Sequence, residues 1–161
     1  MSDEQFEVTD SGAALTQPVQ IGSLRVGHIM CIENMPCKII EMSKAKTGKH
    51  GSAKASIRAQ HIFTGKMKEF IGPTGHNADT PFVINREYVV INVDGDDVAC
   101  IDAEGIEVQG NVLPIHDNDL AKKINTTWDK LQESGEEKEI IIMVTHAMGE
   151  YHITAIKERN I

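Results

Sequence analysis

The sequence is poor in cysteine and aromatic residues, and it contains no long apolar run. Three cysteines are an odd number, which does not suit a scaffold held by disulfides, and we expect reduced core residues. The longest apolar run, Ile140 to Val144, is too short to cross a bilayer, so no membrane insertion is expected. The first ten residues lack the basic start and the apolar run of a secretion signal. A reduced, cytoplasmic setting is therefore predicted, and an additional nuclear pool is left open.

Histidine and cysteine are too scattered to predict a metal site. His28, Cys31 and Cys37 match no usual spacing of zinc ligands, and no fourth ligand lies near them in the sequence. We interpret them as core or turn residues, and His61 as a core histidine on the apolar face of an alternating segment. No metal and no bound cofactor are expected.

The net charge of −8 conceals a basic block. Residues 1–20 contain four acidic residues and no basic one, whereas residues 21–87 contain ten basic and five acidic residues. Residues 88–161 contain six basic and fifteen acidic residues. The basic middle of the chain therefore lies between two acidic parts. The charge of each part indicates a division into regions that the net charge of the whole chain does not reveal.

Short alternating segments predict a mostly β chain with two small barrels. We expect an acidic disordered tail at 1–20, an SH3-like barrel at 21–87 with a basic hairpin at 44–54, and an OB-fold domain with one inserted helix at 88–161. The expected strands are Leu24 to Ile29, Lys38 to Met42, Lys54 to Ile62, Lys66 to Ile71, Tyr88 to Val93, Val98 to Asp102, Ile106 to Leu113, Glu139 to His146 and Tyr151 to Lys157.

The sequence also marks the helix and the link between the barrels. Asp117 is expected to cap a helix that has Trp128 on its apolar face and ends at Gly135. Residues 72–87 combine glycines and two prolines, and we expect a connector that restricts the relative orientation of the two domains. The acidic second domain has few aromatic residues, so it is not expected to bind RNA by itself.

The stretch KAKTGKHGSAK, residues 44–54, is the most distinctive part of the chain. No large apolar residue lies between Ser43 and Ala53, so the segment must lie outside the core. Strict alternation on its N-terminal side would place Cys37, Ile39 and Glu41 on one face of a strand, and alternation resumes after Ala53. A β-hairpin is therefore predicted. Its cations and glycines are Lys44, Lys46, Gly48, Lys49, Gly51 and Lys54.

Clustered lysines favour a partner rich in phosphate, because they repel one another unless a polyanion accepts them. Gly48 and Gly51 flank Lys49 and His50, which keeps bulky side chains away from the Lys49 amine. A phosphate-binding P-loop does not fit, because it needs a glycine where Ser43 stands and a hydroxyl where His50 stands. It would also run from a strand into a helix.

The segment KTGKHGSAK at 46–54 resembles the hypusine-containing translation factor family, eukaryotic initiation factor 5A. The resemblance continues through IFTGKMKE at 62–69 and GHNADTPF at 75–82, and it extends to the length and the acidic N-terminal part. One departure is Ser52, where many members of the family have histidine. This change leaves Lys49 untouched and bears on how the modifying enzyme holds the loop.

The resemblance implies that Lys49 is converted to hypusine. Deoxyhypusine synthase would transfer an aminobutyl group from spermidine, and deoxyhypusine hydroxylase would add a hydroxyl. The remaining loop residues, Lys44, Lys46, Thr47, Gly48, His50, Gly51 and Lys54, would contact the modifying enzymes and the tRNA or rRNA. The family binds the ribosomal E site next to the peptidyl-tRNA, where it promotes peptide-bond formation at stalling sequences such as proline runs and assists termination.

Two classes of function remain open from the residues alone. The first is a modified translation factor without enzymatic activity or catalytic residues. The second is an unmodified, general RNA-binding module whose basic hairpin contacts phosphates. An enzyme is disfavoured because the acidic residues fall in expected hairpin turns and on the expected helix surface, where solvated carboxylates are normal.

Overall fold

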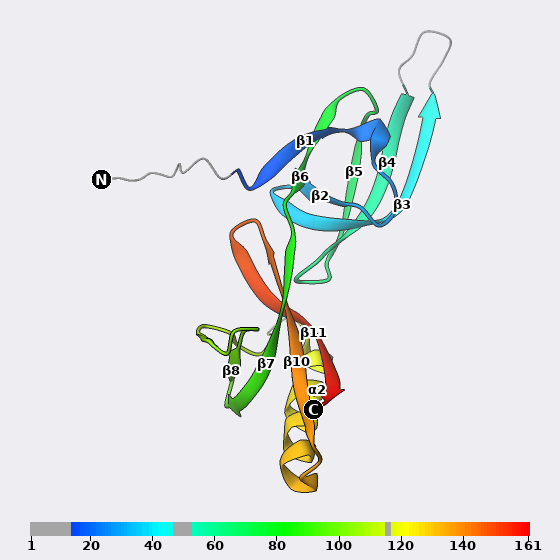
Figure 1. The fold of residues 1–161 in the computed structure, drawn as a ribbon. Helices are drawn as coiled ribbons and strands as arrows, with labels where there is room; N and C mark the ends of the chain where they lie inside the picture. The colour runs from blue at the N-terminus through cyan, green and yellow to red at the C-terminus, as the bar shows by residue number, and fades with distance from the viewer. Residues whose placement is uncertain (1–13, 47–52, 115–116) are drawn as a thin grey trace, which may run out of the picture. The chain divides into compact units, whose positions relative to one another are not determined.

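The chain folds into β-strands and one α-helix in the part that the structure describes (Figure 1). The structure is a computed structural model and describes residues 14–46, 53–114 and 117–161. It forms two compact units: the first ends at Phe82 and includes Ala147–Gly149, and the second takes Val83–His146 and Glu150–Ile161. The mostly β class predicted from the sequence is confirmed. No described helix has the length and apolar character needed to cross a membrane.

The first unit contains a four-stranded antiparallel sheet in the order β2-β3-β4-β5 and a two-stranded sheet of β1 and β6. Its core contains Met30, Cys37, Ile39 and Ile57, with Ile21 and Leu24 from the segment before β2. The elements are β1 (Thr16–Gln20), the 3-10 helix η1 (Ile21–Ser23), β2 (Ile29–Ile32), β3 (Met35–Lys46), β4 (Ala53–His61), β5 (Met67–Pro73) and β6 (Asn77–Pro81).

The second unit contains a five-stranded antiparallel sheet in the order β11-β10-β7-β8-β9, and the helix α2 packs against β11. The elements are β7 (Ile84–Asp94), β8 (Asp97–Ile101), β9 (Glu107–Val108), α2 (Asn118–Ser134), β10 (Lys138–Ala147) and β11 (Glu150–Asn160). Trp128 is partly buried against this core, as predicted, together with the fully buried Ile124 of the same helix.

Part of the predicted tail and part of the predicted connector form a ribbon instead. Thr16–Gln20 is β1, which pairs with β6 (Asn77–Pro81), and Val19 and Ala78 pack in the first core. Both predictions are wrong at these residues, because neither strand alternates clearly and the pairing joins segments far apart in sequence. Prolines are tolerated where a strand keeps one edge unpaired. Residues 1–13 of the predicted tail lie outside the described residues.

The first predicted strand is displaced along the chain. Leu24 to Ile29 is not a strand, because a turn closed by the hydrogen bond from His28 N to Arg25 O occupies that segment, with Gly27 at φ +95°. The strand β2 begins only at Ile29. It joins β3 through Glu33 and Asn34, which both have positive φ, as a type I′ hairpin turn requires.

A β-bulge at Ile40 reverses the predicted face of Glu41. The register of β3 and β4 shifts between Ile39 and Glu41, and beyond the shift Met42 lies opposite Ile57 on the core side. Glu41 therefore points outward, whereas strict alternation predicted that it shares a face with Ile39. The bulge lets β3 bury Ile39 and Met42 on one side without burying the carboxylate between them.

The helix α2 has the ends that its sequence predicts. The Asp117 side chain accepts a hydrogen bond from the Leu120 backbone N–H, and Gly135 adopts the left-handed conformation that ends the helix. The strand predicted at 106–113 is shorter than expected: β9 covers only Glu107–Val108. Gly110 has φ +86°, a conformation that regular strands do not use.

Truncating a fully buried residue of the first core tests where its stability originates. Ile39 is 0% exposed, and Ile39→Ala should lower the free energy of unfolding by about 2–5 kcal/mol because it removes buried methyl groups and leaves a cavity. Urea unfolding followed by circular dichroism measures the change. Ile71, which is 69% exposed, provides a control: Ile71→Ala should change stability by less than about 0.5 kcal/mol. Equal losses would contradict this assignment of the core.

Removing the helix cap should destabilise the second unit. Asp117→Ala deletes the hydrogen bond to the Leu120 N–H and should cost about 1 kcal/mol. Urea unfolding followed by Trp128 fluorescence reports on this unit, since Trp128 packs in its core. Asp129→Ala, at an exposed position within the same helix, should be neutral or slightly stabilising because alanine favours helix. An Asp117→Ala protein as stable as the wild type would exclude the capping role.

Candidate functional site: a basic β-hairpin

The predicted basic hairpin is formed by β3 and β4. The two strands pair without interruption from Glu41↔Arg58 to Lys46↔Ala53. Each of the last three pairs sets an alanine against a lysine: Lys44↔Ala55, Ala45↔Lys54 and Lys46↔Ala53. Large apolar side chains are therefore absent from this end of the two described strands.

The lysines at this end project from both faces of the hairpin. Lys44 and Lys46 lie on the same face as Met42, which is the core side, whereas Lys54 shares the outer face with Ser56 and Arg58. All three lysines are exposed. The described strands thus bring Lys44, Lys46 and Lys54 together, as the sequence predicted. The other predicted site residues, Thr47, Gly48, Lys49, His50 and Gly51, lie outside the described residues.

Lys44 is the one of these three lysines whose ammonium has a partner among the described residues. Its Nζ donates a hydrogen bond of 2.7 Å to the backbone carbonyl of Gly22 in η1. Lys46 and Lys54 form no hydrogen bond or ion pair with any residue that the structure describes. Within the described residues, Lys44 is therefore the one of the three that holds the protein's own backbone.

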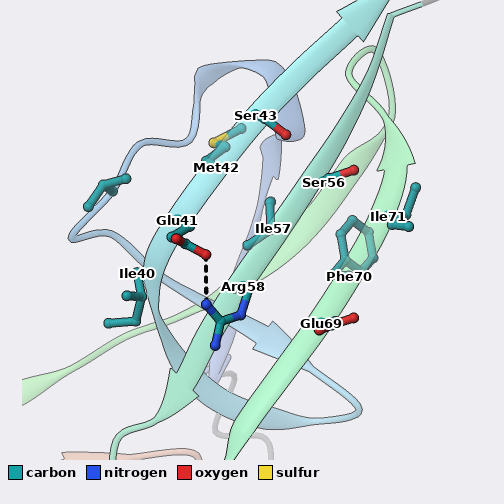
Figure 2. A pocket seen from close by; sticks show the side chains of 11 residues that line it. Ile40, Glu41, Met42, Ser43, Ser56, Ile57, Arg58, Glu69, Phe70 and Ile71 are labelled. Atoms are coloured by element: carbon teal, nitrogen blue, oxygen red, sulfur yellow. Dashed lines mark hydrogen bonds and ion pairs between the residues drawn. The ribbon is translucent and has the colours of Figure 1, made fainter.

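Farther from the tip, the outer face of the hairpin carries charges of both signs. Arg58 forms an ion pair of 2.7 Å with Glu41, and Glu69 of β5 lies opposite Arg58 on its other side (Figure 2). The hydrogen bond with Glu41 raises the pKa of Arg58 above its ordinary value. Because both side chains are about half exposed or more, the pair fixes geometry more than it stabilises the fold. Two carboxylates thus flank Arg58, whereas no acidic side chain lies opposite the lysines near the tip.

A shallow groove of about 760 Å³ lies along the outer face of β3, β4 and β5. Its lining includes the Glu41–Arg58 pair, Ser43, Ser56 and the exposed side chains of Ile40 and Ile71 (Figure 2). The groove was not predicted from the sequence, because its lining comes from three strands and from the bulged residue Ile40. The adjacent pair Ile39 and Ile40 was the available signal, since two consecutive apolar residues interrupt strict alternation.

The described residues offer no evident nucleophile among their cysteines. Cys37 and Cys100 are buried and Cys31 is half-buried, and burial raises the pKa of each thiol. A raised pKa keeps a thiol protonated near neutral pH. In the described part of the chain, no three His, Cys, Asp or Glu side chains are grouped so as to hold a metal ion.

His61 is the core histidine that its position predicted. It is 7% exposed, and its Nδ1 accepts hydrogen bonds from the backbone N–H groups of Phe63 and Thr64. The imidazole therefore shapes the turn between β4 and β5. His61 therefore has a structural role beside Thr64, Gly65 and Lys66, which lie between the two strands.

Comparisons with known proteins agree with this architecture. The family model described as "Translation initiation factor 5A-like, N-terminal" matches residues 14–76. A second model, "Eukaryotic elongation factor 5A hypusine, DNA-binding OB fold", matches residues 82–157 and confirms the OB fold predicted for the C-terminal part.

Curated relatives match the chain over most of their lengths. Eukaryotic translation initiation factor 5A-2 of Caenorhabditis elegans is 40% identical over 155 residues, which cover 96% of this chain and 92% of that protein. Eukaryotic translation initiation factor 5A-1 of Saccharomyces cerevisiae is 35% identical over 160 residues, covering 98% of this chain and 97% of that protein.

Solved structures extend the similarity to the backbone. A translation initiation factor eif-5a family protein from Naegleria fowleri has a TM-score of 0.78 at 36% identity, covering 89% of this chain and 99% of that one. Eukaryotic translation initiation factor 5A from Methanococcus jannaschii has a TM-score of 0.66 at 29% identity, covering 89% and 96%. Sequence, fold and hairpin therefore agree, and the chain belongs to the eukaryotic translation initiation factor 5A family.

Proposed function

We propose that this protein is a non-enzymatic translation factor that carries hypusine on Lys49 and acts at the ribosomal E site beside the peptidyl-tRNA. There it promotes peptide-bond formation at stalling sequences such as proline runs, and it assists termination. The observation that supports this proposal most directly is the β3–β4 hairpin, which ends in small residues and exposed lysines on either side of the segment that contains Lys49.

The shape of the hairpin suits modification by a separate protein, an enzyme that binds it as a substrate. A synthase must bring the Lys49 amine to its own bound NAD and spermidine, so the acceptor has to enter a deep site. Ala45, Ala53 and Ala55 add little width to the last strand pairs. Deoxyhypusine synthase would transfer the aminobutyl group, and deoxyhypusine hydroxylase would complete the spermidine-derived hypusine on Lys49, with no bound cofactor in this protein.

The modified side chain would act through its charge and its reach. Both amines of hypusine should be protonated near neutral pH, as an ordinary lysine is. A long cation that enters an RNA-lined cavity neutralises phosphates and can donate hydrogen bonds to backbone oxygens. Holding the end of a tRNA in a reactive geometry accelerates the reaction without any bond being made or broken by the factor.

The second unit supports this role without being the main RNA contact. Residues 88–161 have nine more acidic than basic residues, and Trp128 is partly buried against the core, which leaves less of its ring available to stack on bases. A strongly negative surface repels phosphates and suits the basic surfaces of ribosomal proteins. We place the protein in the cytoplasm, with a nuclear pool left open.

A second function is favoured by one observation. Lys46 and Lys54 project from opposite faces of the hairpin with no described partner, which would let an unmodified hairpin contact phosphates on both sides. In that case the protein is a general RNA-binding module, and Lys49 contributes only its charge.

Intact and peptide mass spectrometry of the protein from its own host should show a modified lysine. The expected result is added mass confined to the peptide that contains Lys49, because the transfer is directed to that amine. The same chain produced in a host that lacks deoxyhypusine synthase is the control and should have its unmodified mass. An unmodified Lys49 in the native protein would leave only the RNA-binding reading.

Replacing Lys49 by arginine separates charge from modification. Lys49→Arg keeps the positive charge but cannot accept the aminobutyl group, so it should fail to support growth and the translation of polyproline reporters when it replaces the native protein. Lys46→Arg is the matched control, since it keeps the charge three residues away, and it should support both. Full rescue by Lys49→Arg would show that charge alone is sufficient and would refute the hypusine mechanism.

A further inference from the structure

Hydrogen bonds join four segments at the base of the hairpin tip. The Lys44 Nζ on β3 donates to Gly22 O at 2.7 Å, and Gly22 N donates to Thr74 O at 2.9 Å. Thr74 N then donates to Ala53 O on β4, also at 2.9 Å. We call these four residues, Gly22, Lys44, Ala53 and Thr74, the hairpin collar. It connects both strands of the hairpin to η1 and to the end of β5.

The collar is closely packed as well as hydrogen-bonded. A Cβ atom built on Gly22 would lie 3.2 Å from Thr74 O and 3.3 Å from Thr74 Cβ, which is tighter than ordinary contact. Glycine therefore allows η1 to approach the backbone after β5. Ile21, beside it, is 1% exposed and anchors η1 in the first core. The Gly22 carbonyl is thus held in place by a buried neighbour, and Lys44 binds a fixed acceptor.

Lys44 reaches this acceptor from the core side of β3. It lies opposite Ala55, which is 0% exposed and small. The lysine stem can therefore follow the edge of the core while its ammonium stays exposed. Lys46, two residues farther along the same face, forms no hydrogen bond or ion pair with a described residue. The two lysines share a charge, a strand and a face, and among the described residues only Lys44 finds a hydrogen-bond acceptor.

We propose that Lys44 is a positioning residue. Its hydrogen bond to Gly22 ties β3 to η1, and together with the contact between Thr74 and Ala53 on β4 it fixes the two strand ends that flank residues 47–52. Its role differs from the contact role predicted from the sequence. The collar holds β4 at Ala53, which directly follows residues 47–52. It holds β3 at Lys44, three positions before residue 47. This inference rests on the proposed function of Lys49 for its consequence in modification, whereas the collar itself is independent of that function.

Fixed strand ends should lower the cost of docking into the modifying enzyme. Binding a hairpin with fixed strand ends costs less conformational entropy than binding one whose strand ends still have to be ordered. Preorganisation therefore strengthens binding. Loss of the Lys44 contact should then raise KM for the protein substrate. The kcat should stay unchanged, because Lys44 acts before the chemical step.

The kinetic test uses the purified full chain, spermidine, NAD and deoxyhypusine synthase. Lys44→Met keeps the stem and removes the donor, and it should raise KM for the protein by about three- to tenfold, which corresponds to the net contribution of one ordinary hydrogen bond. Lys44→Arg, which keeps a cationic donor, should restore KM. Lys38→Met removes the same charge from an exposed position of β3 outside the predicted contact loop and should leave KM unchanged. An equal effect of Lys38→Met, a failure of Lys44→Arg to restore KM, or a loss confined to kcat would overturn the proposal.

The structural test needs no modification. Amide hydrogen exchange of the unmodified chain should show faster exchange at Gly22 and Thr74 in Lys44→Met, by roughly three- to tenfold, and wild-type rates in Lys46→Met. Unchanged rates at both amides in Lys44→Met would exclude the collar role. A wild-type chain that the synthase does not modify would instead refute the proposed function, and the exchange rates would still decide whether Lys44 holds the collar.

Discussion

The antiparallel pairing of β3 with β4 is the interaction on which the site depends. Near its base, the pair buries Ile39 and Ile57 in the first core, so burial and backbone hydrogen bonds act together. Beyond Met42 the same two strands continue with exposed residues on β3. Continuous hydrogen bonding thus extends the hairpin beyond the core. Because a two-stranded hairpin alone is only marginally stable in water, this extension depends on the packing at its base.

The bulge at Ile40 makes this arrangement compatible with the charges. It directs Met42 toward the core and Glu41 toward Arg58 on the outer face. The Glu41 carboxylate is therefore paired with Arg58 in the lower part of the hairpin, whereas no acidic side chain lies opposite the lysines near the tip. A positively charged end suits the proposed entry of this hairpin into a modifying enzyme and an RNA-lined site.

Sequence reasoning succeeded where the signal is local. The long β4 strand alternates strictly, and Asp117 and Gly135 mark the helix ends with side-chain and glycine chemistry that depends on a few neighbouring residues. It failed for β1 and β6, whose pairing joins residues about sixty positions apart. It also failed for the face of Glu41, because a bulge is selected by packing on both sides of the strand rather than by residue preference.

The amino-acid sequence by itself determined the β class, the two-part organisation, the helix with its caps and the concentration of lysines between two alternating segments. The partners of those lysines were decided only in three dimensions. Lys44 and Lys46 are indistinguishable by composition and spacing, yet one binds the carbonyl of Gly22 and the other meets no described group. The physical reason is that a hydrogen bond needs an acceptor within about 3 Å, and the position of Gly22 depends on how η1 packs in the core, which local sequence does not specify.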